Sequence, residues 1–180
     1  MTRRSLIPHP QSASSATVTA RVALERPTRL IVEYSLSGDL AELVIPRRTA
    51  SRRAERLWEH TCFEAFVASA AGASYCELNF APSTRWAAYA FDGYRQGMRP
   101  LELAKSPTVE VARGASELRV TADIELDGFA DASWPWRIGL SAVVEDRAGG
   151  RAFYALEHPH EKPDFHDAAA FTVLLDGSAR

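Results

Sequence analysis

Short runs in which apolar and polar residues alternate recur along almost the whole chain, and they constrain the fold more than any other feature. Runs of this kind, separated by turns rich in glycine, proline and serine, are typical of β-strands. They lie at residues 17–25, 30–36, 57–67, 75–82, 86–89, 107–113, 117–126, 136–145, 153–156 and 170–175. We therefore predict an all-β fold, an antiparallel β-sandwich of the jelly-roll or immunoglobulin-like kind, with a single domain at residues 16–180 and a flexible lead at residues 1–15.

Composition limits the kinds of partner that the chain can attract. Its 180 residues include 21 Lys and Arg against 23 Asp and Glu, a net charge of −2, so no overall field draws in nucleic acid or an anionic membrane. The basic run at residues 47–56 is interpreted as a solvated loop rather than a phosphate site. The first residues lack the apolar segment of a secretory signal, and no run approaches the roughly 20 apolar residues that span a bilayer. We expect a cytoplasmic protein with neither a nucleic-acid nor a membrane partner.

The two runs at residues 62–67 and 75–80 can pair in two parities, because a slip of one residue moves every side chain to the opposite face. We favour the parity that creates one wholly apolar face, made of Phe63, Ala65, Val67, Cys76, Leu78 and Phe80. The other face then carries Cys62, Glu64, Phe66, Tyr75, Glu77 and Asn79. This parity separates the two cysteines and predicts reduced thiols, whereas the slipped parity would let them bond.

Carried through residues 82–84, the same parity predicts that Trp86 lies beside Glu64 and Glu77, with Ala87, Tyr89 and Phe91 in the apolar layer. A carbohydrate ring could use such a surface, because an aromatic plane packs against C–H groups while carboxylate and amide oxygens bind hydroxyls. The alternative is an ordinary solvated sheet face on which the tryptophan only fills space between layers.

The loop at residues 157–167 combines His158, His160 and His166 with four acids, so metal binding has to be considered. The spacing fits neither a zinc nor a calcium pattern, and a rigid loop held by its own hydrogen bonds is the alternative. The chain has no nucleophile elbow and no phosphate-binding loop. Glu64 and Glu77 could form an acid–base pair for glycoside cleavage, but two carboxylates on adjacent strands more often bind than catalyse. We assign no catalytic residue and no metal site, and favour a protein that is not an enzyme.

Residues 57–67, 75–83, 86–89 and 94–98, together with two C-terminal segments, resemble the DOMON-like domains of bacterial proteins. The C-terminal segments are Tyr154–Pro159 and Lys162–His166, and the resemblance extends over about residues 15–176. This group is similar to the family 9 carbohydrate-binding modules, whose pattern of a tryptophan, acids and alternation corresponds here to Trp58, Glu59 and Glu64. The resemblance implies a β-sandwich that binds either a sugar or haem.

The two implied ligands predict two sets of site residues. For a carbohydrate or sugar-like molecule on the concave sheet face, the set is Trp58, Glu64, Glu77, Asn79, Trp86, Tyr94 and His158, with residues 94–98 and 157–166 as walls. For haem, the iron ligands would be Met98 with His158, Lys162 or His166. We predict a non-catalytic sugar-binding module that requires no cofactor. The alternatives are a haem-binding redox or electron-transfer domain, and a structural or protein-interaction domain; haem b and calcium are the cofactors considered. An exposed sheet edge could pair two copies of the chain.

Overall fold

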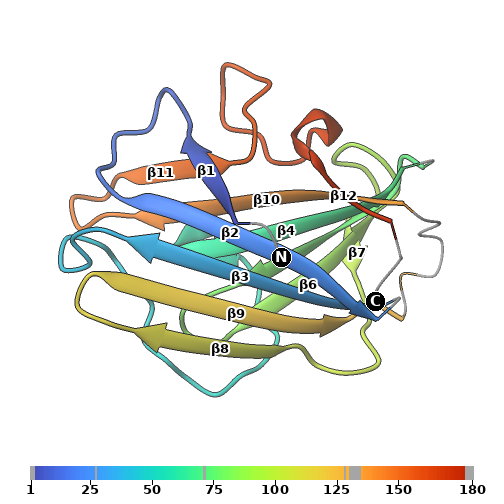
Figure 1. The fold of residues 1–180 in the computed structure, drawn as a ribbon, viewed down its shortest axis with the longest axis horizontal. Coiled ribbons are helices and arrows are strands. Elements are labelled where there is room, and N and C mark those ends of the chain that lie inside the picture. The colour runs from blue at the N-terminus through green and yellow to red at the C-terminus, as the bar shows by residue number, and fades with distance from the viewer. Residues whose placement is uncertain (1–2, 27, 71, 128, 130–134, 177–180) are drawn as a thin grey trace.

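The strands are antiparallel throughout, and they account for most of the regular structure (Figure 1). The computed structural model describes residues 3–26, 28–70, 72–127, 129 and 135–176. The strands are β1 Arg4–Pro8, β2 Thr17–Arg26, β3 Arg29–Ser37, β4 Cys62–Ser69, β5 Tyr75–Phe80, β6 Trp86–Phe91, β7 Arg99–Pro100, β8 Thr108–Arg113, β9 Glu117–Glu125, β10 Trp136–Glu145, β11 Arg151–Ala155 and β12 Val173–Leu175. Two 3₁₀ helices, η1 Leu57–Glu59 and η2 Ala168–Ala170, lie between them. Neither is long and apolar enough to cross a membrane, and the described residues contain no helix that is.

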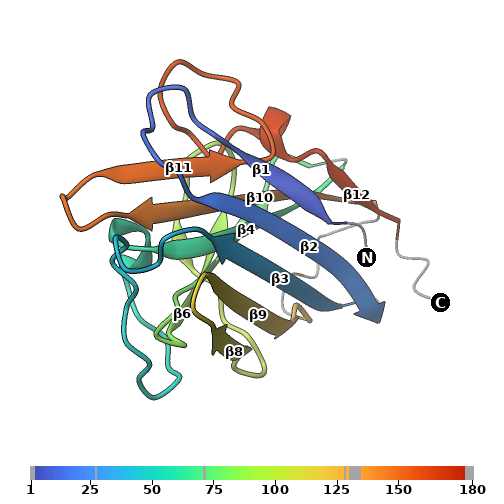
Figure 2. The ribbon, with the colours of Figure 1, turned by 60° about the vertical axis from the view of Figure 1, so that its left-hand side comes forward.

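The strands form two layers that share one strand. Sheet A has the order β1-β2-β3-β9-β8, and sheet B has the order β7-β6-β5-β4-β10-β11. Strand β1 pairs with β2 through one part of its length and with β11 through the other, so it joins the two sheets along one side (Figures 1 and 2). Strand β12 pairs with the first residues of β10. The predicted β-sandwich is therefore confirmed.

The two sheets differ in how they are buried, and this difference decides where a site can form. In sheet A, burial alternates along the strands, so that one face packs on the core and the other carries ion pairs such as Arg29 with Asp123, 2.6 Å apart. In sheet B, every residue of β4, β5 and β6 is buried. One face of sheet B packs against sheet A, and its opposite face, called here the outer face, is covered by other segments of the same chain.

The favoured pairing of β4 with β5 is confirmed. Phe63 lies opposite Phe80 and Val67 opposite Cys76 in the core, while Glu64 lies opposite Asn79 on the outer face. Both cysteines are buried and unbonded, as predicted. The parity that we extended to β6 is wrong, however.

Trp86 lies opposite Phe80, on the core face. Its ring packs in the core under the guanidinium of Arg53, 4.7 Å from the ring centroid. The outer face instead receives Ala87, Tyr89 and Phe91, the three residues that we expected in the core layer. The error arises because both faces of β6 are buried, so hydrophobicity alone does not distinguish them.

The two chain ends also differ from the prediction. The lead expected to be flexible contains β1, whose Leu6 is buried in the core. In the last predicted strand, at residues 170–175, only Val173–Leu175 pairs as β12, because η2 occupies the start of this segment. Residues 1–2 of the predicted lead and 177–180 of the predicted domain lie outside the described residues.

Candidate functional site

A second apolar cluster covers much of the outer face of sheet B. It contains Phe66, Ala68, Tyr75, Ala87, Tyr89, Phe91, Ala170 and Phe171, with Leu57, Trp58 and Phe165 at its margin. Phe171 stacks on Phe66, with the ring centroids 5.5 Å apart. Its ring also lies over Gly139 of β10, where a Cβ atom would come within 2.5 Å of the ring carbon Cδ1. The glycine therefore allows the segment after β11 to settle directly on the sheet.

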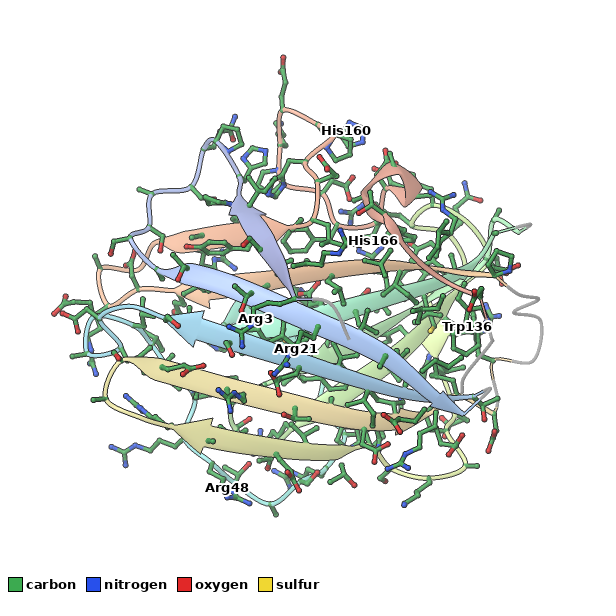
Figure 3. All side chains as sticks on the ribbon, viewed as in Figure 1. Arg3, Arg21, Arg48, Trp136, His160 and His166 are labelled. Atoms are coloured by element: carbon green, nitrogen blue, oxygen red, sulfur yellow. The ribbon has the colours of Figure 1, made fainter. Side chains whose placement is uncertain are left out.

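A cavity of about 370 Å³ lies between this sheet face and the loops that cover it. It is lined by Trp58, Glu64, Glu77, Phe91, Arg95, Met98, Val143, Arg151, Phe153, Pro163, Phe165 and His166. Strands β4, β5, β6, β10 and β11 supply its floor, and residues 95–98 and 163–166 supply walls. Both predicted wall segments therefore contribute to one cavity. His166, from the second of these segments, is labelled in Figure 3.

Two carboxyl groups and an amide form the polar part of the floor. Asn79 Nδ2 donates a hydrogen bond to Glu77 Oε1, 2.7 Å away. Glu64 faces Asn79 across the β4–β5 pair. Two buried oxygens here, Glu64 Oε1 and Asn79 Oδ1, have no hydrogen-bond partner among the described residues. The hydroxyl of Ser141 faces Glu64 from β10, and its interaction with that carboxyl group opposes the rise in its pKa. Because buried polar atoms are normally paired, this floor has unused hydrogen-bonding capacity.

Burial raises the pKa of both carboxyl groups. The pKa of Glu64 lies well above its usual range, first because the side chain is buried and second because the charge of Glu77 is close. Burial also raises the pKa of Glu77, although the hydrogen bond from Asn79 and the charge of Arg95 oppose this. The pair consequently holds protons more tightly than exposed carboxyl groups do.

His166 forms part of the wall beside Glu77. Its Nδ1 lies 2.7 Å from the Tyr75 hydroxyl, whose oxygen accepts a hydrogen bond from the backbone N–H of Arg95 at 3.2 Å. The hydroxyl proton is therefore free to be donated to Nδ1, which leaves the imidazole proton on Nε2, 3.8 Å from Glu77 Oε2. Burial, with a contribution from the charge of Arg95, lowers the pKa of His166 to about 4, so the ring is neutral at pH 7.

An ion pair joins the two wall segments. Arg95 donates to Asp164 over 2.9 Å, and the Tyr94 hydroxyl and the backbone N–H of His166 donate to the same carboxylate. Burial works to raise the pKa of Asp164, but these hydrogen bonds outweigh it and the pKa is lowered. Asp164 thus holds His166 in place from one side while Tyr75 holds it from the other.

The predicted site residues divide into two groups. Trp58, Glu64, Glu77, Met98 and His166 line the cavity, and Asn79 lies beneath it, hydrogen-bonded to Glu77. Trp58 contacts Tyr89 edge to face, with the ring centroids 5.9 Å apart.

The remaining predicted residues do not line the cavity, so the predicted set of site residues is corrected at these positions. Trp86 is on the core face of β6, as described above. The ring of His158 turns away to the N-terminal strand, where its Nε2 donates to the carbonyl of Ile7 at 2.8 Å. Lys162 is exposed and does not line the cavity. Tyr94 is half exposed and acts on the cavity through Asp164 rather than by lining it.

The sequence analysis missed four lining residues on the strands, namely Phe91, Val143, Arg151 and Phe153. Arg95, Pro163 and Phe165 lie in the two predicted wall segments but were not named individually. Val143 and Phe153 are direct partners on β10 and β11, so the alternation of these strands could have identified them. Arg95 had no comparable signal, because its partner Asp164 lies 69 residues further along the chain. Among the described residues, no three His, Cys, Asp or Glu side chains are grouped to hold a metal ion.

No protein-family model matches the sequence, and no curated protein is similar to it in sequence. The structure is similar to that of a Bacteroides uniformis ATCC 8492 protein proposed to bind carbohydrate. The TM-score is 0.67, with 14% sequence identity, and the match covers 94% of this chain and 84% of the other. It is also similar to a family 9 carbohydrate-binding module from Caldicellulosiruptor kristjanssonii in complex with cellotriose. Here the TM-score is 0.53, with 9% identity over 86% of this chain and 72% of the other. The chain therefore has an antiparallel β fold like that of the family 9 carbohydrate-binding modules.

Proposed function

We propose that the protein is a non-catalytic, DOMON-like binding module whose outer-face cavity binds a carbohydrate or sugar-like small molecule. The observation that carries this proposal is the floor of the cavity, where Glu64 Oε1 and Asn79 Oδ1 are buried without a hydrogen-bond partner. A ligand that donates a hydrogen bond to Glu64, which lines the cavity, would offset the cost of burying this oxygen unpaired.

The rest of the cavity suits a small ring. Its volume of about 370 Å³ lies within the usual range for ligand sites, about 300–1,000 Å³. Trp58, Phe91, Phe153 and Phe165 supply apolar surface for the C–H groups of a ring, while the floor supplies hydrogen-bond acceptors for its hydroxyls. The fold supports the proposal because the structural relative from Caldicellulosiruptor kristjanssonii is a carbohydrate-binding module.

The proposal is tested by isothermal titration of the purified protein with glucose and cellotriose. Replacing Trp58 by alanine removes an aromatic wall, and we expect a loss of at least about 1 kcal/mol, or more than fivefold in affinity, if this wall contacts the ligand. The control variant is Leu174→Ala, an exposed apolar residue of β12 that does not line the cavity. Binding that is equally strong in the wild type and in Trp58→Ala would place the ligand elsewhere. Failure of both sugars to bind would count against the proposal itself.

A haem-binding redox role is the second candidate, because Met98 and His166 line the same cavity. Nε2 of His166 would bind iron only after the Tyr75 hydroxyl reversed its hydrogen bond, since Nε2 carries the proton in the tautomer described above. Protein purified from cells supplied with a haem precursor distinguishes the two roles. A Soret band that disappears in Met98→Ala and in His166→Asn would favour haem, and colourless protein would eliminate it.

A further inference from the structure

We propose that the floor of the cavity is an ammonium site, at which Glu64 and Glu77 bind the protonated amino group of an amino sugar while Asn79, beneath them, orients Glu77. This inference rests on the proposed function, because it takes the same cavity and names the chemical class of its ligand. It follows from the balance of donors and acceptors on the floor and from the charges around it.

The floor offers mostly acceptors. The hydrogen bond from Asn79 to Glu77 uses one of the two donor hydrogens of the amide, and it leaves the amide oxygen as a buried acceptor without a partner. Glu64 Oε1 is a second such acceptor, and its side chain is 3% exposed. The hydroxyl of Ser141, which faces Glu64, is both donor and acceptor. A neutral hydroxyl carries one hydrogen to donate, whereas a primary ammonium carries three and has no lone pair to satisfy, so the ammonium is the better match to an acceptor-rich floor.

The charges on the floor favour the same ligand. Arg95 is the lining cation whose charge acts on both carboxyl groups, but its guanidinium is hydrogen-bonded to Asp164. His166 is neutral at pH 7 and lies 3.8 Å from Glu77, beyond hydrogen-bonding distance. Neither Glu64 nor Glu77 therefore has an ion pair with Lys or Arg among the described residues. Two buried carboxyl groups without a cationic partner are costly to ionise, and a ligand cation supplies the missing charge.

The walls are compatible with a cation attached to a ring. Trp58, Phe91 and Phe165 place aromatic surface around the floor, and such surfaces attract an organic cation as well as the C–H groups of a sugar. Burial raises the pKa of both carboxyl groups and so favours their protonated forms, whereas a bound ammonium favours the carboxylates. Binding of an amine should therefore release a proton, and binding of a neutral sugar should not.

The experiment compares glucosamine with glucose and N-acetylglucosamine, which keep the ring but lack the positive charge. Titration calorimetry at about pH 7, in two buffers that differ in ionisation enthalpy, measures affinity and proton release together. We expect glucosamine to bind roughly tenfold or more tightly than glucose, as hydrogen bonds to charged groups warrant, and to release a proton on binding. Replacing Glu64 by glutamine keeps the shape of the floor and should remove most of this preference. The control variant, Glu110→Gln, changes an exposed carboxylate on β8 and should leave the preference intact.

The outcomes separate this inference from the proposed function. Equal or tighter binding of glucose would overturn the ammonium site while supporting a sugar-binding cavity. Failure of glucosamine to bind would overturn the ammonium site, and the glucose and cellotriose titrations would then decide the proposed function separately. Should Glu64→Gln fail to fold, Glu77→Gln and the proton release of the wild type still decide the question. Preferred binding of glucosamine without proton release, unchanged in both glutamine variants, would place the amine away from this floor.

Discussion

Lowering the pH should destabilise the protein through His166. The folded state holds this ring neutral, with a pKa of about 4, whereas an unperturbed histidine has a pKa of about 6.5. Below the unperturbed pKa, the unfolded chain binds a proton that the folded chain does not. The stability contributed by the neutral ring is therefore complete above about pH 6.5 and is lost as the pH falls toward 4.

The size of this effect follows from the two pKa values. With a pKa of 6.5 in the unfolded state and about 4 in the folded state, the free energy of unfolding should fall by about 2 kcal/mol at pH 5 and by about 3 kcal/mol at pH 4. The side chain is 16% exposed, so solvent screens this effect only weakly. Glu64 and Glu77, whose pKa values are raised, act in the opposite direction, and a comparison between two variants is needed to separate them.

The comparison is between the wild type and His166→Asn, whose amide can still accept a hydrogen bond from Tyr75. Urea denaturation of both proteins at about pH 7.5, 5 and 4 gives the free energy of unfolding of each. We expect the wild type to lose about 3 kcal/mol relative to the variant between the highest and the lowest pH. Changes at the two glutamates largely cancel because both proteins contain them. A difference that stays constant within about 0.5 kcal/mol over this range would refute the assignment of a buried, neutral His166.

Three further predictions concern the packing that supports the site. Replacing Gly139 by alanine would drive a methyl group into the ring of Phe171, and we expect a loss of about 1–3 kcal/mol in urea denaturation; an unchanged midpoint would show that the covering segment moves freely. Replacing Tyr34 by phenylalanine removes a 2.6 Å hydrogen bond to a β4 carbonyl in the core, with an expected loss of about 1 kcal/mol; a variant as stable as the wild type would show that this bond contributes nothing. Burial raises the pKa of Cys62 and Cys76, so a thiol reagent at about pH 8 should label the native protein far more slowly than the urea-unfolded protein. Equally fast labelling would contradict their burial.

The pairing of β4 with β5 could be predicted because one of its two parities produces a wholly apolar face. Burying Phe63, Val67 and Leu78 together is so favourable that the alternation of hydrophobic residues fixes the register. The same register brought Glu64, Glu77 and Asn79 to one face, and this is the part of the site that alternation identified. Trp58, Met98 and His166, which also line the cavity, were predicted from the family resemblance.

The rest of the site depended on contacts that alternation does not encode. Trp86 was assigned to the wrong face because sheet B is buried on both sides, so either face offers a tryptophan an apolar environment. The position of Arg95 depends on Asp164 in a distant loop, and a pair of this kind leaves no periodic pattern in the sequence. His158 was predicted to bind the ligand because it lies in the loop at residues 157–166, which was expected to form a wall of the site. Its ring is instead held by a hydrogen bond to the backbone carbonyl of Ile7.

The shared strand β1 bears directly on how the protein should be produced. A recombinant fragment starting at residue 16, the boundary that the strand pattern suggests, would leave β2 and β11 without their common neighbour. It would also remove the carbonyl of Ile7 that binds His158, and the imidazole of His9 whose Nε2 donates to the carbonyl of His160 at 3.2 Å. Both attachments anchor the loop that continues into the cavity wall. Such a fragment would retain every residue that lines the cavity and still give a misleading negative result in a ligand screen, so the protein used in such a screen should include β1.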